Sequence, residues 1–332
     1  MKIAVVGCGA VGSYYGAKLA TLNEQVHFLL RSDYEAVRRR GVLVRSPQGD
    51  FRAFPRCAQS PQEIGICDLV LIGLKTTANE QFKGLLPPLV GPNTAILTLQ
   101  NGLGNEEQLA TLFSEAQILG GLCFVCLNRL EPGLIQHQDH GQIVLGEWRR
   151  WPEPRTHSLA SLFRRAGVPC KVSADLERAH WEKLVWNIPF NGLGVAAAAG
   201  YEALVNAAVP VLRSGPCRPT DALLKEPCWE ALVRELMNEV IRVAQALNLK
   251  VESRLADKQI ARTQTMGAYK ASTLIDFERG QSLELESLFL NPLRNAREVG
   301  VQVPRLQALC RVLGALDPGA RRVHESATPK SG

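Results

Sequence analysis

The stretch Gly7-Cys8-Gly9-Ala10-Val11-Gly12 decides the fold of this chain. The apolar run 3–6 precedes it and the amphipathic segment 14–22 follows it, so the sequence predicts a strand, a glycine turn and a helix. The first glycine permits a tight turn, the second lets backbone approach a pyrophosphate, and the third lets the helix pack closely on the strand. The helix N-terminus then favours an anion. We therefore expect a bound dinucleotide, with a purely structural turn as the alternative.

Length and composition narrow the class of protein. The chain has 332 residues, of which 46% are hydrophobic, and this length usually forms about two domains. The first apolar run is broken by glycines, unlike a signal peptide, and no apolar run approaches the ~20 residues of a membrane span. We therefore expect a cytoplasmic protein with no membrane partner. Nine scattered cysteines predict reduced thiols in the core.

The charge pattern favours small ligands over nucleic acid. The net charge is +6, but the basic residues are dispersed apart from 38–40 and 149–150, which are typical of solvated surfaces. We therefore expect a small anionic ligand and no nucleic-acid partner.

A second parallel strand is predicted over residues 25–31, and it ends where a dinucleotide-binding fold places its ribose selector. NAD enzymes usually carry an acidic residue there, whereas this strand ends in Arg31. A guanidinium can fork onto a 2′-phosphate, so the sequence favours NADPH/NADP as cofactor. The alternative is that Arg31 is merely exposed and that Asp33 serves a 2′-hydroxyl.

Two further strands lead into polar loops. The buried strand 68–74 stops at Lys75, and the strand 95–99 leads to Gln100-Asn101-Gly102. Ligands of open α/β sheets collect at the carboxyl ends of strands, so Lys75 and Asn101 are candidate cofactor contacts. A solvated lysine at the end of a strand is the alternative for Lys75. Between these regions, residues 42–44 and 51–54 predict a surface hairpin.

A zinc site is the competing interpretation of residues 123–140. Cys123, Cys126, His137 and His140 form a C-x2-C-x10-H-x2-H pattern. Zinc-finger histidines usually stand three to five residues apart, and side chains three apart on a strand point to opposite faces. We therefore expect no metal and a hairpin between the apolar strands 121–127 and 142–146.

The second half of the chain predicts a separate all-helical domain. We assign 1–174 to an NADP-binding Rossmann-type α/β domain, 175–316 to a helical substrate and catalytic domain, and 317–332 to a disordered tail. The helices expected from periodicity are 176–195, 230–247, 255–273, 283–299 and 306–316.

The first of these helices carries a polar stripe. Lys183, Asn187 and Asn191 recur every four residues and share one face among apolar neighbours. Buried polar groups must find partners, so the stripe indicates a ligand cleft, with a solvent-exposed face as the alternative. Pro189 should kink the helix near the stripe.

Two polar positions follow downstream. We expect Ser272 near the end of one helix, together with Asp276, and Glu284 in the first turn of the next, where an anion is favoured.

In their order along the chain, these residues resemble the ketopantoate reductase family (2-dehydropantoate 2-reductases), and the resemblance covers nearly the whole sequence. The motifs that carry it are Gly7-x-Gly9-x-x-Gly12, Arg31, Lys75, Gln100-Asn101-Gly102, Trp181-Glu182-Lys183 with Asn187 and Asn191, and Ser272 to Glu284. The resemblance implies a Rossmann domain joined to a helical domain, with NADPH and a branched 2-oxo acid meeting between them. It implies reduction of ketopantoate to pantoate in pantothenate biosynthesis.

The resemblance also assigns roles to residues. It makes Lys183 the proton donor, with Glu284 as a second catalytic residue on the cofactor side. It places the substrate on Asn101, Asn187, Asn191 and Ser272, with Asn101 also touching the cofactor. The chemistry agrees, because an ammonium can stabilise a developing alkoxide and donate its proton to it.

One departure from the family pattern concerns Tyr201, which stands where these reductases often carry another substrate asparagine. The alternatives are therefore a reductase of another branched or bulkier 2-oxo acid, or a non-catalytic NADP-binding sensor. We expect a monomer or a homodimer.

Overall fold

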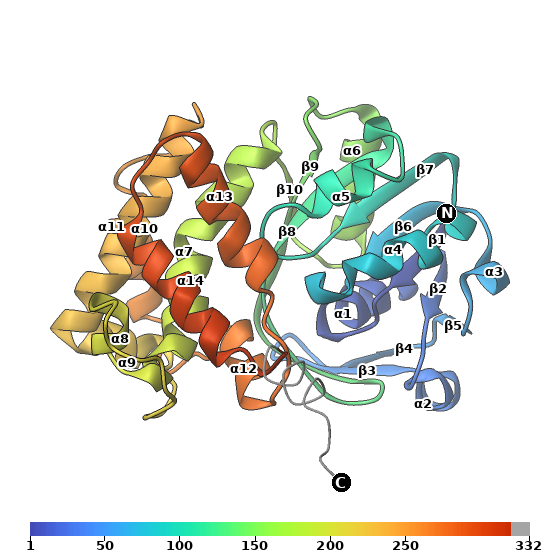
Figure 1. Cartoon of the computed structure of the whole chain (residues 1–332). Helices are drawn as coiled ribbons and strands as arrows, with labels where there is room; N and C mark the ends of the chain where they lie inside the picture. Colours follow the sequence, from blue (N-terminus) through green and yellow to red (C-terminus); the bar gives the residue numbers. More distant parts are fainter. Residues whose placement is uncertain (320–332) are drawn as a thin grey trace, which may run out of the picture. The chain divides into compact units, whose positions relative to one another are not determined.

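The computed structural model describes residues 1–319 of the chain (Figure 1). Contacts divide the chain into two compact units, the first comprising Met1–Ala179 and the second beginning at His180. The division falls within helix α7 (Leu176–Ala196), whereas the sequence placed the boundary after residue 174. Of the tail predicted over 317–332, residues 320–332 lie outside the described residues.

The first unit contains a 10-stranded sheet with the strand order β4-β3-β9-β8-β7-β6-β1-β2-β5, and β10 pairs with β9. Its strands are β1 Lys2–Val6, β2 Gln25–Leu29, β3 Val42–Arg45, β4 Phe51–Ala53, β5 Arg56–Ala58, β6 Cys67–Ile72, β7 Val90–Thr98, β8 Ile118–Glu131, β9 Leu134–Glu147 and β10 Cys170–Val172. The strands β5, β2, β1, β6, β7 and β8 run parallel to their neighbours in this order, as in a dinucleotide-binding sheet. The expected hairpins, β3 with β4 and β8 with β9, are confirmed as antiparallel pairs.

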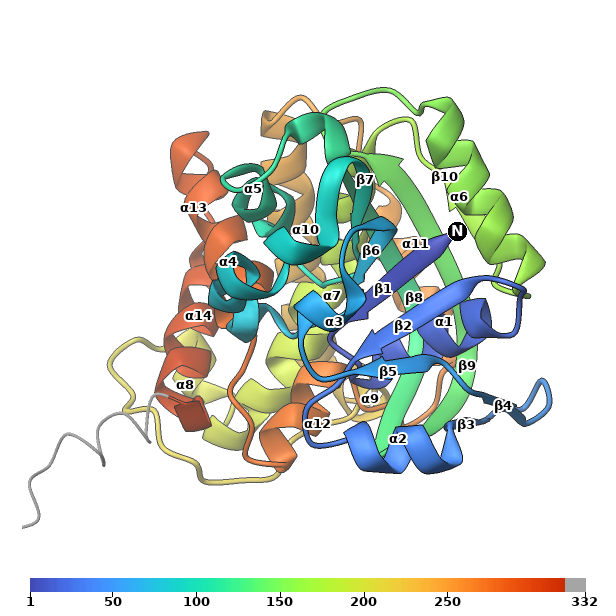
Figure 2. The same cartoon turned by 90° about the vertical axis from the view of Figure 1, so that its right-hand side faces the viewer.

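Helices cover both faces of this sheet because alternate strand residues point to opposite sides. Ile3 and Val5 of β1 join one core with residues of α1 and α6, whereas Ala4 and Val6 join another with residues of α3, α4 and α5. Figure 2 shows α1 and α6 on one side of the sheet and α4 and α5 on the other. The helices of this unit are α1 Ala10–Ala20, α2 Tyr34–Arg40, α3 Pro61–Ile64, α4 Phe82–Leu85, α5 Asn105–Ala110 and α6 Pro154–Arg165, with the 3-10 turns Thr76–Gln81, Pro87–Leu89 and Glu115–Gln117.

The second unit is helical over its described residues, as the sequence predicted. Its elements are the body of α7, a 3-10 turn Ala197–Ala199, α8 Glu202–Val205, α9 Thr220–Lys225, α10 Pro227–Ala246, α11 Leu255–Gln264, α12 Ser272–Glu278, a π-helical turn Glu286–Leu290, α13 Asn291–Glu298 and α14 Pro304–Leu316. None of the helices in residues 1–319 combines the length and the apolar character that crossing a bilayer demands.

Two of the expected helices are wrong in their extent. The single helix expected over 255–273 is split, because α11 ends at Gln264 and α12 begins at Ser272. Gly267 lies between them with φ +63°, a left-handed conformation that a right-handed helix cannot contain. Ser272 therefore begins a helix instead of lying near the end of one.

The helix expected over 283–299 is likewise interrupted. Glu284 precedes its first helical residue, Leu285, and does not lie within a first turn. The π-helical turn then leads into α13, which carries Pro292 at its start. A π turn accommodates one extra residue per turn and changes which side chains share a face, which 3.6-residue periodicity does not reveal.

Buried carboxylates join helices of the second unit. Glu239 of α10 accepts hydrogen bonds from the backbone N–H groups of Arg305 (3.0 Å) and Leu306 (2.8 Å), in the first turn of α14. Burial raises the pKa of Glu239, and the two N–H donors oppose this shift. After α14, the Asp317 carboxylate accepts a hydrogen bond from the Leu283 N–H at 3.0 Å.

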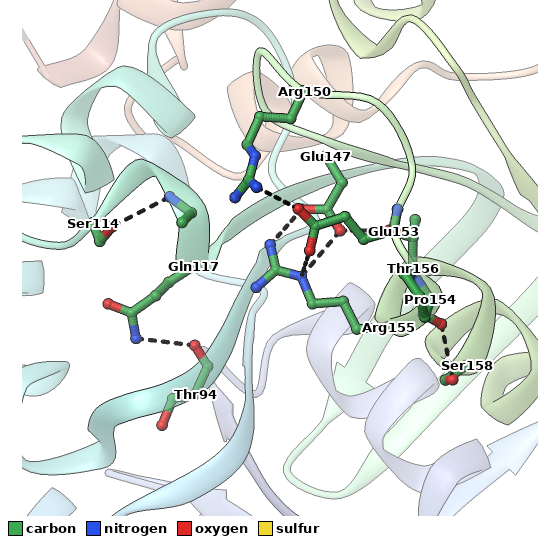
Figure 3. Close-up of polar contacts among 11 residues, drawn as sticks. Thr94, Ser114, Gln117, Glu147, Arg150, Glu153, Pro154, Arg155, Thr156 and Ser158 are labelled. Carbon is green, nitrogen blue, oxygen red and sulfur yellow. Dashed lines mark hydrogen bonds and ion pairs between the residues drawn. The ribbon is translucent and has the colours of Figure 1, made fainter.

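An ionic cluster fixes the start of α6 to the end of β9 in the first unit (Figure 3). The Glu147 side chain is fully buried, and it accepts hydrogen bonds from Arg155 Nε (3.1 Å), Arg155 Nη2 and Thr156 Oγ1. This contact with Glu147 raises the pKa of Arg155. The neighbouring Arg150 pairs only at the surface, with Glu153.

Loss of the Arg155 guanidinium should destabilise the first unit strongly. We expect Arg155→Ala to lower the free energy of unfolding by about 3 kcal/mol, because the buried Glu147 carboxylate would lose its charged partner. Arg150→Ala is the matched control and should cost less than about 1 kcal/mol, since its pair is exposed. Urea unfolding measures both, and equal losses would contradict a special role for the buried pair.

Candidate active site

The carboxyl ends of four neighbouring strands are aligned in one row. In the parallel register, Val6 of β1 stands opposite Leu29 of β2 on one side and Ile72 of β6 on the other, and Ile72 stands opposite Thr98 of β7. The segments that follow these four residues carry the predicted cofactor contacts: Gly7 to Gly12, Arg31, Lys75 and Asn101. The chain leaves β1 for β2 on one side and returns through β6 on the other, so the row includes a topological switch point, where open α/β sheets bind ligands.

The three glycines of the turn after β1 meet three different steric demands. Gly7 has φ +93°, and a Cβ on it would lie 2.3 Å from the backbone nitrogen of Leu74. A Cβ on Gly12 would lie 2.2 Å from the carbonyl oxygen of Gly7, so this glycine allows α1 to pack against the turn. A Cβ on Gly9 would meet no atom of residues 1–319 within 4 Å. Open space beside Gly9, at the N-terminus of α1, is what close approach of a pyrophosphate requires.

Lys75 lies next to this turn because of the segment that precedes it. Gly73 donates its N–H to Val6 O at 2.8 Å, and a Cβ on Gly73 would lie 2.8 Å from Gly12 Cα. The end of β6 is therefore packed against the glycine turn, and the exposed Lys75 follows directly. This position suits an ammonium that approaches a ligand held by the turn.

Arg31 and Asp33 follow β2, and the two side chains have different surroundings. Arg31 is exposed, just beyond the strand end at Leu29. Asp33 is buried and its carboxylate is held by Arg129, which donates from Nε to Oδ2 at 2.9 Å and from Nη2 to Oδ1. Of the two candidate ribose selectors, Arg31 is thus the exposed one and Asp33 already has a cationic partner.

A buried network of amides holds the loop that contains Asn101. Gln100 Nε2 donates to Asn79 Oδ1 (2.6 Å), Asn79 Nδ2 donates to Asn105 Oδ1 (3.0 Å), and Asn105 Nδ2 donates to the Asn101 carbonyl (3.2 Å). Thr98 at the end of β7 supplies a further donor to Gln100, at 2.9 Å. The network ties the loop to the strand before it and the helix after it, so the backbone of Asn101 has little freedom.

The polar stripe of α7 is buried within the second unit, which rules out a wholly solvent-exposed face. Asn187 and Asn191 are buried, and Lys183 is half-buried. Trp186, on the same helix, donates from Nε1 to Thr263 Oγ1 at 2.9 Å. Its ring also packs against the Phe190 ring, with the ring centroids 5.0 Å apart. Pro189 lies inside the helix. A buried amide pair beside a lysine is an unusual use of a helix core and favours a ligand role.

Asn191 is brought together with Ser272. Its Oδ1 accepts hydrogen bonds from the Thr273 N–H at 3.1 Å and from Ser272 Oγ at 3.3 Å, both at the start of α12. Asn191 therefore anchors α12 with its oxygen, and its Nδ2 is the donor side of the same planar amide. The two predicted substrate residues lie within hydrogen-bond distance of one another.

Glu284 and Tyr201 are the other two residues of the second unit that the sequence singled out. Glu284 is buried, with only 5% of its surface exposed, two residues before the π-helical turn, and π turns are frequent at functional sites. Tyr201 is half-buried at the start of α8, and its ring contacts the Trp229 ring edge-on, with centroids 5.6 Å apart. The ring of Tyr201 thus packs against α10.

The zinc alternative finds no support in the described residues. Cys123 and Cys126 lie on β8, and His137 on β9 is buried with its ring Nδ1 2.8 Å from Ser46 Oγ. Within residues 1–319, no group of three or more His, Cys, Asp or Glu side chains could hold a metal ion.

Sequence reasoning missed the residues that support the site from behind. Asn79 lies 26 residues from Asn105, its partner beside the Asn101 loop, and Arg129 lies 96 residues from Asp33. The asparagine at the start of α5 is the only one of these with a local signal, since it follows the glycine-rich loop directly. The other two depend on tertiary contacts.

Comparisons with known proteins agree with this geometry. Residues 3–150 match the family model described as ketopantoate reductase PanE/ApbA, and residues 204–317 match the model of its C-terminal domain. The chain belongs to the ketopantoate reductase family. It is 38% identical to the 2-dehydropantoate 2-reductase of Nostoc sp., over 95% of both proteins. This member of the family is therefore an oxidoreductase, and the fold class and resemblance expected from the sequence are confirmed.

Two solved structures have the same fold along nearly their whole length. The 2-dehydropantoate 2-reductase of Geobacter metallireducens is 45% identical, with a TM-score of 0.86, and the match covers 95% of this chain and 99% of that one. The enzyme of the same name from Methylococcus capsulatus is 31% identical, with a TM-score of 0.84 and complete coverage of both chains.

The amide network should govern how firmly the Asn101 loop is held. We expect Asn105→Ala to destabilise the first unit by about 1–3 kcal/mol, because Asn79 would lose its acceptor in a buried position. Thr111→Ala is the control: this residue follows the same helix, and its hydroxyl bonds only locally, to Gln108 O at 2.7 Å. Thermal unfolding of both variants measures the difference. A loss for Asn105→Ala no larger than for the control would contradict the role of the network.

Proposed function

We propose that this family member reduces ketopantoate to pantoate with NADPH, the reaction of the pantothenate pathway, and that it does so in the cytoplasm. The observation that carries the proposal is the aligned row of strand ends, which is followed by the open space beside Gly9, by Lys75 and by the exposed Arg31. The α7 stripe of the second unit, with Asn187 and Asn191 buried and Lys183 half-buried, would supply the groups that a 2-oxo acid requires.

The cofactor roles follow from charge and geometry. The residues Gly7, Cys8, Gly9, Ala10, Val11 and Gly12 form the turn and first helical residues whose N–H groups would receive the pyrophosphate. The Arg31 guanidinium would bind the 2′-phosphate of NADPH, and Lys75 and Asn101 would contact the cofactor from the neighbouring strand ends. NADPH would supply the hydride.

The catalytic roles follow from the charge that develops on the substrate oxygen during reduction. Reduction of a ketone leaves an alkoxide, and the Lys183 ammonium would stabilise this charge and donate a proton to the oxygen. Asn187 and Asn191 offer amide donors for the substrate carboxylate, and the Ser272 hydroxyl would turn from Asn191 Oδ1 to the substrate. Glu284 would act from the cofactor side, as the resemblance to the family implies.

Steady-state turnover against a panel of 2-oxo acids tests the substrate. We expect oxidation of NADPH to be fastest with ketopantoate. A higher kcat/KM for a bulkier 2-oxo acid would assign the substrate preference to that class, and the absence of turnover with every member of the panel would overturn the proposal in favour of a non-catalytic NADP-binding protein.

Replacement of Lys183 should impair chemistry more than cofactor binding. We expect Lys183→Ala to lower kcat by about 10²–10⁴-fold, because a positioned general acid contributes that much. The Kd for NADPH, measured by fluorescence, should stay nearly unchanged. Lys250→Ala is the control, since Lys250 is exposed on the same unit. A Lys183→Ala enzyme with near-normal kcat would refute the assignment and direct attention to Lys75.

Replacement of Arg31 should affect NADPH selectively. We expect Arg31→Ala to weaken NADPH binding by about 1.5–3 kcal/mol and NADH binding little, because only NADPH carries the 2′-phosphate. Arg39→Ala is a matched control: this arginine is exposed on α2, where it pairs with Glu35 at 3.4 Å. Titration with each dinucleotide measures the Kd values. Equal losses for both dinucleotides would exclude Arg31 as the phosphate ligand.

A further inference from the structure

The Asp33 carboxylate occupies the region that selects between the two dinucleotides. It follows β2 closely, and in dinucleotide-binding folds an acidic residue at the end of this strand accepts the ribose 2′-hydroxyl of NAD. The glycine turn reaches the end of the same strand, because Cys8 Sγ donates to the Leu29 carbonyl oxygen at 3.6 Å. Burial raises the pKa of Cys8, and the charges of Cys57 and Asp33 raise it further. A bare carboxylate here would favour NADH and would repel the 2′-phosphate of NADPH.

In this structure both oxygens of that carboxylate are already used. Arg129 donates to Oδ2 from Nε at 2.9 Å and to Oδ1 from Nη2, a two-pronged contact, and Ser32 Oγ donates to Oδ1 at 3.0 Å. The Asp33 side chain is 8% exposed and the Arg129 side chain 36% exposed. A guanidinium fork both neutralises a carboxylate and fills its lone pairs, and partial burial reduces screening of the pair by salt.

Arg129 reaches Asp33 because of the length of the β8–β9 hairpin. The tip of the hairpin contacts the other end of α2. A Cβ on Gly133 would lie 2.9 Å from the carbonyl oxygen of Gly41, which directly follows α2. The Leu43 N–H of the adjoining strand β3 donates to Gly133 O at 2.8 Å. The hairpin therefore holds α2 at both ends, at Asp33 and at Gly41. The position of the guanidinium is thus set by the sheet and not by a mobile loop.

We propose that Arg129 is a positioning residue that sets coenzyme preference, because it neutralises the Asp33 carboxylate and leaves the exposed Arg31 to bind the 2′-phosphate. This inference rests on the proposed use of NADPH and names the contact that protects that preference. Without the Arg129 guanidinium, the Asp33 carboxylate would favour NADH over NADPH.

A purely structural role of the pair predicts a different pattern. If Arg129 only fastens the hairpin to α2, its loss should weaken both dinucleotides to the same degree, and removal of the Asp33 charge should not repair the defect. If Arg129 masks the carboxylate, its loss should change the ratio of the two affinities, and neutralising Asp33 in the same protein should restore that ratio.

The test is a double-mutant cycle on the full chain with the variants Arg129→Met, Asp33→Asn and the two combined. Methionine keeps most of the aliphatic stem and removes the charge. The Kd values of NADP⁺ and NAD⁺ are measured by fluorescence titration, with adenosine 2′,5′-bisphosphate and 5′-AMP as fragments that isolate the 2′-phosphate. Circular dichroism establishes that each variant is folded.

We expect Arg129→Met to lower the preference for NADP⁺ over NAD⁺ by about tenfold or more, mostly through weaker NADP⁺ binding. The double variant should return the preference to within about threefold of the wild-type value. Asp33→Asn alone should keep or increase the preference for NADP⁺, and it tests the proposal even if Arg129→Met does not fold. A wild-type preference in Arg129→Met, or a double variant that fails to recover it, would overturn the inference.

These measurements also keep the inference separate from the proposed reaction. Binding requires no turnover, so a wild-type protein that binds NADP⁺ but does not reduce ketopantoate would refute the substrate and leave the role of Arg129 to be decided by the cycle. A wild-type protein that binds NAD⁺ more tightly than NADP⁺ would overturn both the proposed cofactor and this inference.

Discussion

The parallel register of β2, β1, β6 and β7 is the constraint on which the rest of the first unit depends. Because Leu29, Val6, Ile72 and Thr98 are register partners in one row, the segments after them all leave the sheet on the same side, at the carboxyl ends of its parallel strands. A shift of one residue in any pair would turn the strand's core residues to the other face, so burial on both faces fixes the register strongly. The position of the proposed cofactor contacts is thus decided by the packing of the core.

Sequence reasoning succeeded where the determinant was local. The strand, turn and helix around Gly7 were predictable because glycine spacing and apolar periodicity are properties of adjacent residues. Lys75 and Asn101 could be placed on the same side of the sheet because the carboxyl ends of neighbouring parallel strands lie together. The break between α11 and α12 was missed because Gly267 is a weak signal in a helical pattern, and the π turn after Glu284 was missed because a pattern read at 3.6 residues per turn does not reveal one inserted residue.

The supporting contacts were beyond sequence reasoning for a different reason. Arg129 and Asp33 are 96 residues apart, and they meet only because β8 and β9 extend far enough to reach α2. A carboxylate after the second strand is ambiguous without this knowledge, since the same residue attracts a 2′-hydroxyl when bare and does not when masked. Element lengths and long-range pairing decide between these outcomes, and neither is encoded by the neighbours of Asp33.

The two units meet the electrostatic demands of the proposed reaction by different means. Backbone N–H groups at the glycine turn are fixed by the fold and lose no side-chain entropy on binding a phosphate, whereas a lysine or an amide must be oriented by other contacts. Asn191 shows how this is done in the second unit. Its Oδ1 accepts from Thr273 N and Ser272 Oγ, and because the amide group is planar, fixing the oxygen also fixes the direction of the Nδ2 donor. The contact that anchors α12 thereby orients the group that the proposed substrate carboxylate requires.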